Sequence, residues 1–556
     1  MTSHEMAELW ATHPSFDEET RSKAREILSR PQEIASCFGT DLTFGTGGLR
    51  GVLGVGTNRM NVYTVARATQ ALSRYLLKNG GHGVAIAYDS RHCSRQFAFV
   101  AAGVLAQNGI VAHIYPRLMP TPMLSFAVRA LGCDAGIVIT ASHNPAQYNG
   151  YKVYGPDGCQ ITEEAAGAII DELESVPHTG MAWLSPEEAQ ARDLLVEIPQ
   201  QVCDDFVART LACRVDPKAC APLRVVYTPL HGTGLEPVRR VLGSMSGVQV
   251  IEIASQCRPD GDFPTCPKPN PELREALRLG LETAAAERAD LLIATDPDCD
   301  RVGVAVRDAS GAYEVLTGNE VGLLLLEYLL RTRRAQGNLP ERPVVVKTIV
   351  TSDLAFAIAQ TYGAQVVEVL TGFKYIGETI GRLERAGEAD RFVFGFEESC
   401  GYLAGTHVRD KDGVMACMLV VEMAQACAAR GTTLKAELDA LYARYGFMEN
   451  NLLNFDIPGA VPMDEMRRVM CSLREEPIEH LAGARVTSVK DYAAGLDGLP
   501  PSDVLSYAAG ALKAIVRPSG TEPKVKVYLS ARADDPAVAE ALLDAMAEEI
   551  NERILG

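Results

Sequence analysis

Short apolar runs alternate with segments of helical periodicity along most of the chain. Each run ends in a polar loop, and a helix-period segment often follows the loop. Clear examples begin at residues 83, 223, 290 and 342, with the sequences GVAIAYDSRHCSRQFAFVAAGVLAQNG, LRVVYTPLHGTGLEPVRRVLG, DLLIATDPDCDRVGVAV and RPVVVKTIVTSDLAFAIAQTYG. Strands that alternate with helices predict layered α/β domains. No fixed-period repeat relates these units, so any kinship among them must be structural.

The chain of 556 residues is long enough for three to four domains of about 150 residues each. A polar, proline-bearing segment at 215–224 indicates a first boundary, and a long apolar helix that starts at residue 318 indicates a second. The third boundary is expected at 445–450. We therefore predict domains at 1–212, 213–318, 319–447 and 448–556.

The last hundred residues have a different pattern of apolar and polar positions. Residues 511–533 (ALKAIVRPSGTEPKVKVYLSARA) predict two strands joined by a loop, and residues 535–555 predict an acidic amphipathic helix. We expect a smaller α+β domain here that closes over the others.

Charge and cysteine usage exclude several classes of function. The formal net charge of -18 repels nucleic acid and anionic membrane surfaces, so an anionic ligand would need local cations. The first residues do not resemble a signal peptide, and Glu422 interrupts the longest apolar stretch. Fourteen cysteines without a C-x-x-C pair predict reduced thiols. We expect a cytoplasmic protein without nucleic-acid or membrane partners.

The stretch GIVITASHNPAQYNGYK, residues 136–152, ends a buried apolar strand in a polar, turn-prone loop. Ser142 thus stands at the carboxyl end of a strand, where open α/β sheets bind their ligands. A serine in such a loop can equally serve only its own turn. Other segments must decide between these readings.

A second loop, DLLIATDPDCDR, places three carboxylates at alternate positions: Asp296, Asp298 and Asp300. Such close carboxylates repel one another unless a cation lies among them, and an all-oxygen set favours Mg²⁺. An EF-hand is excluded because Arg301 stands where that loop needs glycine, and Arg307 where it needs glutamate. A solvated acidic turn is the alternative.

Further loops carry groups suited to a phosphorylated sugar. Arg517, Ser519, Gly520 and Thr521 in RPSGTEPK offer a guanidinium, hydroxyls and backbone N–H groups to a phosphate. The loops FGTGGLRG, GFEESCGY and TGFKYIGE add an arginine and a lysine for anions and two hydrogen-bonding side chains for sugar hydroxyls; these residues are Arg50, Lys374, Glu397 and Ser399. Each loop alone can be a plain turn, but together they indicate phosphoryl transfer on a phosphosugar.

Four of these segments, in this order, resemble the signature loops of the α-D-phosphohexomutase superfamily: TASHNPAQYNGYK, TDPDCDRVG, GFEES and RPSGTEPK. The resemblance runs from about residue 44 to residue 529. YDSRH, TPLHGTG, PDGDFPT, LTGFKYIGE and VRDKDG resemble its longer phosphoglucomutase and phosphopentomutase-like branch. It implies three related α/β domains with mixed sheets plus a C-terminal α+β domain around a central cleft.

The resemblance also implies a role for each candidate residue. Ser142 would be the phosphoserine, and one Mg²⁺ per chain would be held by Ser142, Asp296, Asp298 and Asp300. Arg50, Arg301 and His143 would lie at the transferring group. Glu397 and Ser399 would hold sugar hydroxyls, and the distal phosphate would contact Lys374, Arg517, Ser519, Gly520 and Thr521.

The general acid and base are less clear from the resemblance. Lys152 matches a family lysine proposed for acid–base catalysis. Shorter relatives have a histidine directly after the glutamate–serine loop, whereas this chain has Cys400, Gly401 and Tyr402 there. His407 is our candidate replacement, and Lys411 is nearby.

We therefore expect a mutase that moves a phosphoryl group between C1 and C6 of a hexose, with glucose 1-phosphate and glucose 6-phosphate as its pair. A sugar 1,6-bisphosphate would be intermediate and activator, and the protein would be a monomer or homodimer. Mannose or pentose phosphates, or sugar-bisphosphate synthesis, are alternatives within the class. A phosphatase that passes the phosphoryl group to water, or a sensor without catalysis, would be different classes.

Overall fold

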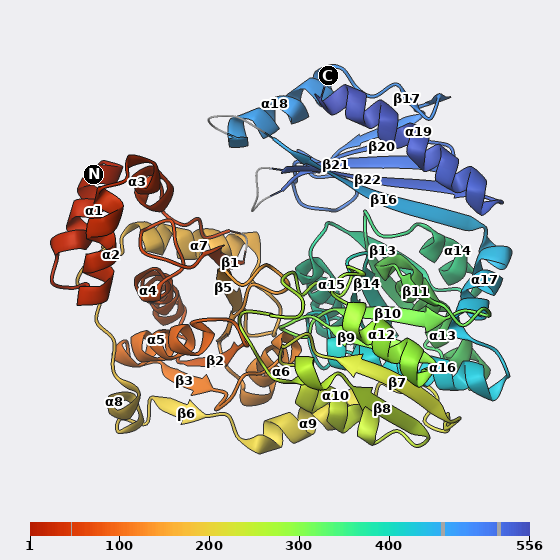
Figure 1. Ribbon diagram of the computed structural model, residues 1–556, viewed down its shortest axis with the longest axis horizontal. Helices are drawn as coiled ribbons and strands as arrows, with labels where there is room; N and C mark the ends of the chain where they lie inside the picture. Colours follow the sequence, from red (N-terminus) through yellow and green to blue (C-terminus); the bar gives the residue numbers. More distant parts are fainter. Residues whose placement is uncertain (46, 458–461, 520–523, 556) are drawn as a thin grey trace.

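The computed structural model describes residues 1–45, 47–457, 462–519 and 524–555. Two of the residues predicted to bind phosphate, Gly520 and Thr521, lie outside these ranges. Figure 1 shows the first α/β unit and the helices that precede it on one side of the molecule, and the C-terminal sheet above the third α/β unit. The described chain forms three α/β units and one α+β unit, as predicted.

The first sheet has the order β1-β5-β4-β2-β3-β6, in which β4, β2, β3 and β6 pair in parallel and β5 pairs antiparallel with both β4 and β1. Its strands are β1 (Gly48–Val52), β2 (Gly83–Tyr88), β3 (Val111–Ile114), β4 (Ala135–Ile139), β5 (Tyr148–Tyr154) and β6 (Leu195–Glu197). The helices of this unit are α4 (Val62–Lys78), α5 (Ser94–Gln107), α6 (Thr121–Leu131), α7 (Glu163–Glu174), α8 (Pro186–Gln190) and α9 (Gln200–Leu211). Buried parallel strands explain the continuous apolar runs in the sequence.

The second and third sheets repeat the same arrangement of a parallel core and an antiparallel hairpin. The second has the order β11-β10-β9-β7-β8 and contains β7 (Leu223–Thr228), β8 (Val248–Glu252), β9 (Leu291–Thr295), β10 (Val302–Arg307) and β11 (Tyr313–Leu316). The third has the order β13-β12-β14-β15 and contains β12 (Val344–Thr348), β13 (Gln365–Val369), β14 (Phe392–Glu397) and β15 (Gly401–Leu403). Their helices are α10 (Leu235–Gly243), α11 (Ala254–Cys257), α12 (Arg278–Glu287), α13 (Gly318–Ala335), α14 (Leu354–Thr361), α15 (Phe373–Arg385), α16 (Gly413–Ala429) and α17 (Leu434–Tyr445).

The kinship among the three units shows in their hairpin loops. In each unit one strand of the parallel core turns into an antiparallel neighbour, through the β4–β5, β9–β10 and β14–β15 loops. Each loop contains a non-glycine residue in the left-handed region: Ser142 (φ 53°), Cys299 (φ 52°) and Cys400 (φ 59°). The three informative motifs of the sequence therefore occupy equivalent places in three sheets.

The C-terminal unit is an antiparallel sheet with the order β16-β22-β21-β20-β19. Its strands are β16 (Phe447–Asp456), β19 (Ser488–Asp491), β20 (Leu505–Ala509), β21 (Leu512–Pro518) and β22 (Lys524–Ala533), and its helices are α18 (Pro462–Glu475) and α19 (Pro536–Leu555). The ammonium of Lys513 lies 3.0 Å from a carboxylate oxygen of Asp353 on the third unit. A small apolar cluster that includes Ile349 and Ile515 packs at the same junction.

The largest core runs continuously through the three α/β units, with α16 buried within it. A helix that is apolar on all sides is stable in such a place. Its one charged residue, Glu422, is fully buried and paired with Arg214 at 2.6 Å. Among the described residues no single helix is both long and apolar enough to span a membrane; α16 and α17 meet that criterion only as a pair bent by 87°.

Three helices precede the first sheet: α1 (Ser3–Thr12), α2 (Glu18–Leu28) and α3 (Pro31–Phe38). They enclose a separate cluster that includes Trp10 and Phe16, whose rings stack with centroids 4.4 Å apart. Tyr63 at the start of α4 joins this cluster, which attaches the helices to the first unit.

Candidate active site

The β4–β5 loop presents the hydroxyl of Ser142 to the second unit. The backbone N–H of Ser142 donates to the Thr140 hydroxyl at 2.8 Å, and Oγ donates to a carboxylate oxygen of Asp296 at 2.8 Å. The imidazole of His143 lies 3.2 Å from the same Oγ. A left-handed backbone is costly for serine, and such strain is found at functional loops that the surroundings hold in place.

A buried arginine holds this loop in its conformation. The guanidinium of Arg91 donates to four carbonyl oxygens of the loop, those of Ser142 (2.6 Å), Pro145 (3.0 Å), Tyr148 (3.1 Å) and Asn144. Its charge is balanced by Asp89 at 3.3 Å, and both side chains are fully buried. Our sequence analysis gave Arg91 no role; an Arg-Asp pair directly after a buried strand, in YDSR, was the available signal.

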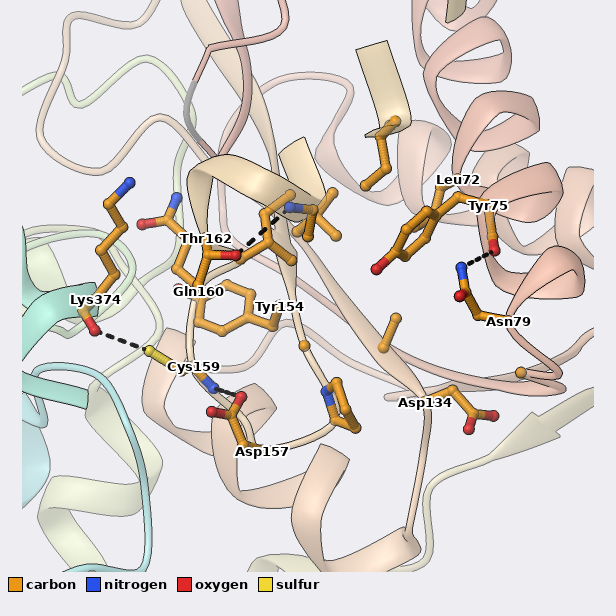
Figure 2. Close-up of a pocket in the computed structure, with 18 of the residues that line it drawn as sticks. Leu72, Tyr75, Asn79, Asp134, Tyr154, Asp157, Cys159, Gln160, Thr162 and Lys374 are labelled. Carbon is orange, nitrogen blue, oxygen red and sulfur yellow. Dashed lines mark hydrogen bonds between the residues drawn. The ribbon is translucent and has the colours of Figure 1, made fainter. Parts of the chain in front are cut away.

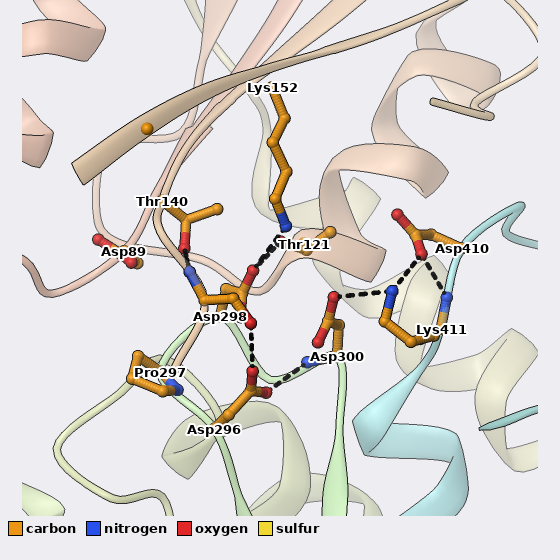
Figure 3. Close-up of polar contacts among 12 residues, drawn as sticks. Asp89, Thr121, Thr140, Lys152, Asp296, Pro297, Asp298, Asp300, Asp410 and Lys411 are labelled. Atoms are coloured by element: carbon orange, nitrogen blue, oxygen red, sulfur yellow. Dashed lines mark hydrogen bonds and ion pairs between the residues drawn. The ribbon is translucent and has the colours of Figure 1, made fainter. Parts of the chain in front are cut away.

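The three aspartates of the β9–β10 loop lie together, as Figure 3 shows. All are buried, and one oxygen of each lies within 4.8 Å of the others. Asp296 accepts hydrogen bonds from the backbone N–H groups of Asp300 (3.1 Å) and Arg301 (3.0 Å). This local pattern orients the loop, because the first carboxylate caps the turn that carries the third.

Cations from other units face the same carboxylates. Lys152 on β5 lies 3.1 Å from Asp298, which also accepts from the Thr121 hydroxyl at 3.1 Å. Lys411 lies 3.2 Å from Asp300. Although burial opposes the charged form, Asp300 and Asp410 raise the pKa of Lys411 above its usual value. Lys411 therefore remains an ammonium at neutral pH.

The aspartates fit a divalent cation. Among the described residues, one buried oxygen of Asp298 and one of Asp300 have no hydrogen-bond partner, which is costly unless an ion accepts their lone pairs. Burial and the charges of Asp298 and Asp300 raise the pKa of Asp296 well above its usual value. Buried like charges with unpaired oxygens call for a hard cation, and Mg²⁺ suits this all-oxygen set.

A cavity of about 600 Å³ opens beside these groups and is lined by residues from all four units. They include His143 from the first, Arg301 from the second, Glu397 and Ser399 from the third, and Arg517 from the C-terminal unit. Glu397 accepts a hydrogen bond from the backbone N–H of Gly372 at 2.9 Å. A polar cavity of this size suits a small, heavily hydroxylated anion.

Positive charge within the cavity sets the state of His143. Burial, with the nearby Arg301 and Arg50, lowers the pKa of His143 well below its usual value. The ring is therefore neutral at neutral pH and has one nitrogen able to accept a proton. Arg301 itself is paired with Glu272 at 2.8 Å.

Comparison with known proteins decides the family. Four models described as phosphoglucomutase/phosphomannomutase α/β/α domains I, II and III and C-terminal domain match residues 41–179, 204–311, 317–445 and 476–549. A phosphoglucomutase of Staphylococcus epidermidis is 37% identical over 538 residues, which cover 94% of this chain and 95% of that protein. The chain belongs to the phosphoglucomutase/phosphomannomutase family.

More distant relatives agree with this membership. A phosphoglucomutase of Staphylococcus aureus is 35% identical, with 93% of each chain covered. In fold, the chain is similar to the open form of pp63/parafusin, a phosphoglucomutase from Paramecium, with a TM-score of 0.67 at 18% identity over 92% of this chain and 95% of that one. The domain boundaries that we set after residues 212, 318 and 447 stay predictions.

Within this family fold, two predicted residues lie away from the cavity described above. Lys374 at the start of α15 pairs with Glu163 of the first unit at 2.7 Å and lines a second cavity of about 450 Å³. Figure 2 shows this second cavity, where the Cys159 thiol also contacts the Lys374 carbonyl oxygen. To grip a phosphate in the main cavity, Lys374 would have to leave Glu163.

His407 is the second predicted residue that lies away from the main cavity. Among the described residues its polar contacts are with Asp412 at 3.1 Å and Cys213 at 3.8 Å, and none joins it to Ser142 or to the three aspartates. Lys411, four residues further on, reaches Asp300 instead. The sequence marked the right stretch of chain, but it did not indicate which of its side chains turns toward the aspartates.

Of the remaining described candidates, Arg517 lines the main cavity, whereas Arg50 and Ser519 are not among its lining residues. Arg50 is on β1, where its Cα pairs with Gly150 of the serine hairpin. The guanidinium of Arg517 donates to the Thr371 hydroxyl. Ser519 is buried, and its N–H donates to the Lys524 carbonyl at 2.8 Å.

Proposed function

We propose that this chain interconverts glucose 1-phosphate and glucose 6-phosphate through a phosphorylated Ser142. The observation that carries the proposal is the 2.8 Å hydrogen bond from the Ser142 hydroxyl to Asp296, within a buried cluster of three carboxylates. A hydroxyl held against a candidate metal site can be phosphorylated and can pass the phosphoryl group on. The similarity to phosphoglucomutases over nearly the whole chain supports glucose as the sugar.

Each group near Ser142 has a task in this proposal. Asp296, Asp298 and Asp300, with an oxygen of the phosphorylated serine, would hold one Mg²⁺. The bound ion would neutralise charge on the phosphoryl oxygens and make the phosphorus a better electrophile. Arg50 and Arg301 would share the remaining negative charge. Arg91 would keep the serine loop oriented, because its guanidinium donates to backbone carbonyls of that loop.

The transfer then needs only positioning and proton movement. The C6 hydroxyl of bound glucose 1-phosphate attacks the phosphorus, its proton goes to a base, and the bond from phosphorus to Ser142 breaks. The neutral ring of His143 suits the accepting role. The ammonium groups of Lys152 and Lys411 suit neutralising the serine oxygen as it leaves.

The glucose 1,6-bisphosphate formed turns within the cavity and returns its C1 phosphate to Ser142, which leaves glucose 6-phosphate. Glu397 and Ser399 would hold sugar hydroxyls during both steps. The distal phosphate would be bound by Arg517, Ser519, Gly520, Thr521 and Lys374. Added bisphosphate would act as an activator by rephosphorylating any free serine. A monomer or homodimer in the cytoplasm remains our expectation.

A competition assay tests the sugar and the reaction together. Glucose, mannose, glucosamine and ribose 1-phosphates would be compared by kcat/KM in Mg²⁺ with a trace of bisphosphate. The proposal expects glucose to be preferred. A preference for mannose or ribose would retain the mechanism with a different substrate, and release of inorganic phosphate without isomerisation would indicate a phosphatase.

A further inference from the structure

The contacts of His407 form a second chemical cluster outside the candidate active site. Nε2 of its ring lies 3.1 Å from a carboxylate oxygen of Asp412, and Nδ1 lies 3.8 Å from the sulfur of Cys213. The ring is nearly buried and packs against Phe206, with centroids 5.9 Å apart. Thiol, imidazole and carboxylate therefore follow one another in the order used to activate nucleophilic cysteines.

Positive charge gathers on the sulfur side of this cluster. Although burial opposes it, the Cys213 sulfur and the Asp412 carboxylate raise the pKa of His407 to about 10. The ring is therefore an imidazolium at neutral pH when Cys213 is a thiolate. The charge of the Arg333 guanidinium on α13 acts on Cys213 electrostatically rather than through a hydrogen bond and, among the described residues, it has no carboxylate partner. One cation therefore contacts the thiol, and a second adds to the positive charge around it.

The cluster is assembled from three distant segments. Cys213 follows α9, His407 and Asp412 lie between β15 and α16, and Arg333 lies in the last turn of α13. Asp412 is fixed because its other oxygen accepts the N–H groups of Val414 (2.9 Å) and Met415 (3.0 Å) at the start of α16. The neutral thiol can donate to the Ala404 carbonyl, 3.3 Å from the sulfur. The imidazolium would stabilise the sulfur once that proton is lost.

We propose that Cys213 is a reactive thiol that hydroperoxides oxidise to a sulfenic acid. In this step the thiolate attacks one oxygen of hydrogen peroxide, an S–O bond forms and the O–O bond breaks. The sulfur gives up two electrons and the peroxide gains them. The leaving hydroxide takes the Nδ1 proton of His407 and departs as water, and the ring regains a proton from solvent. The proposal does not depend on the mutase activity.

Other cysteines of the same chain are internal controls. Cys220 and Cys471 are exposed, whereas Cys213 is half-buried. Neither control sulfur has a hydrogen bond to another group in the described part of the chain. If access alone decided reactivity, these two would react first. If neighbouring cations decide it, Cys213 reacts first.

The test is competitive labelling of the full native chain. Iodoacetamide or hydrogen peroxide at limiting concentration would be added at pH 6.5, and modified peptides would be quantified by mass spectrometry. We expect Cys213 to react about tenfold faster than Cys220 and Cys471 or more, since thiolate content sets the rate. Equal or slower reaction of Cys213 would overturn the proposal.

Two substitutions identify the cause. His407→Asn removes the imidazolium, and Arg333→Met removes the second cation with a side chain of similar length. Each is expected to slow Cys213 toward the control rates and leave Cys220 and Cys471 unchanged. A labelling rate of Cys213 that neither substitution changes would also refute the proposal. If the His407→Asn protein unfolds, labelling of the buried Cys417 will reveal it. The Arg333→Met protein and the pH profile of wild-type labelling then test the proposal.

Discussion

The β4–β5 and β9–β10 loops have the same place in related sheets, yet they are held in different ways. The aspartate loop is oriented by its own backbone, because Asp296 accepts the N–H groups of Asp300 and Arg301. The serine loop depends on Arg91, which lies 51 residues from Ser142 in the chain. The same kind of hairpin loop is therefore stabilised in two ways. In the second unit, local hydrogen bonds orient the candidate metal-binding carboxylates. In the first unit, an arginine that is distant in the sequence orients the nucleophilic serine.

This difference predicts that the two loops fail differently when altered. Changes to the aspartate loop should affect metal binding first. Changes around the serine loop should affect the rate of transfer and leave the metal site intact. Four experiments follow, from the largest expected effect to the smallest.

Ser142→Ala should abolish the function of the serine loop without moving the aspartates. We expect turnover of glucose 1-phosphate to fall at least about a thousandfold, because the phosphoryl carrier is gone. Intact-mass measurement should find no phosphorylated form after incubation with bisphosphate. Ser29→Ala, on the exposed end of α2, is the control. Residual phosphorylation of the Ser142→Ala protein would refute the assignment.

Asp300→Asn tests the other loop. It keeps the size of the side chain but removes a charge from the candidate metal site, so we expect activity to fall by about 10²–10³ and Mg²⁺ dependence to shift to higher concentration. Asp308→Asn, half-buried just after β10, is the matched control. Full activity of wild-type enzyme after exhaustive chelation would contradict the metal site altogether.

Arg91→Met sharpens the comparison, because it loosens only the serine loop. We expect kcat to fall by about ten- to a hundredfold from misplacement of Ser142, with little change in the Mg²⁺ requirement. Loss of the guanidinium also leaves Asp89 buried without its partner, which destabilises proteins by about 3–5 kcal/mol. The Arg91→Met/Asp89→Asn protein separates these effects: its stability should recover and its kcat should not. Recovery of both would mean that Arg91 acts only on folding.

The smallest effect concerns stability and pH at the third loop, β14–β15. Burial and the neighbouring Glu397 raise the pKa of Glu398 from 4.5 to about 7. The folded chain therefore binds more protons than the unfolded chain between these values, so the contribution of Glu398 to stability is lost as pH rises through this window. Thermal unfolding of Glu398→Gln should show a flatter pH dependence from 4.5 to 7. An unchanged slope would assign the dependence to other groups.

Much of the fold followed from local pattern. Apolar runs predicted β2, β7, β9 and β12, and residues 511–555 predicted the last hairpin strands and α19. The order of the strands within each sheet was beyond this pattern, since it depends on which runs pair across long connections. The contrast between His407 and Lys411 has the same origin: a sequence of five residues does not show which side chain turns toward another domain.

What the sequence determined by itself was the chemistry available: a hydroxyl at a strand end, three carboxylates at alternate positions, and loops equipped for phosphate. These are properties of neighbouring residues, which covalent spacing keeps together in any fold. Only the tertiary structure decided which other side chains contact these groups. Examples are the hydrogen bonds of Arg91 to the serine loop, the pairing of Lys152 and Lys411 with the aspartates, and the thiol cluster at Cys213. Each joins segments that meet only when separate sheets pack. Burial strengthens the electrostatic part of these contacts, because charges interact more strongly when they are removed from water.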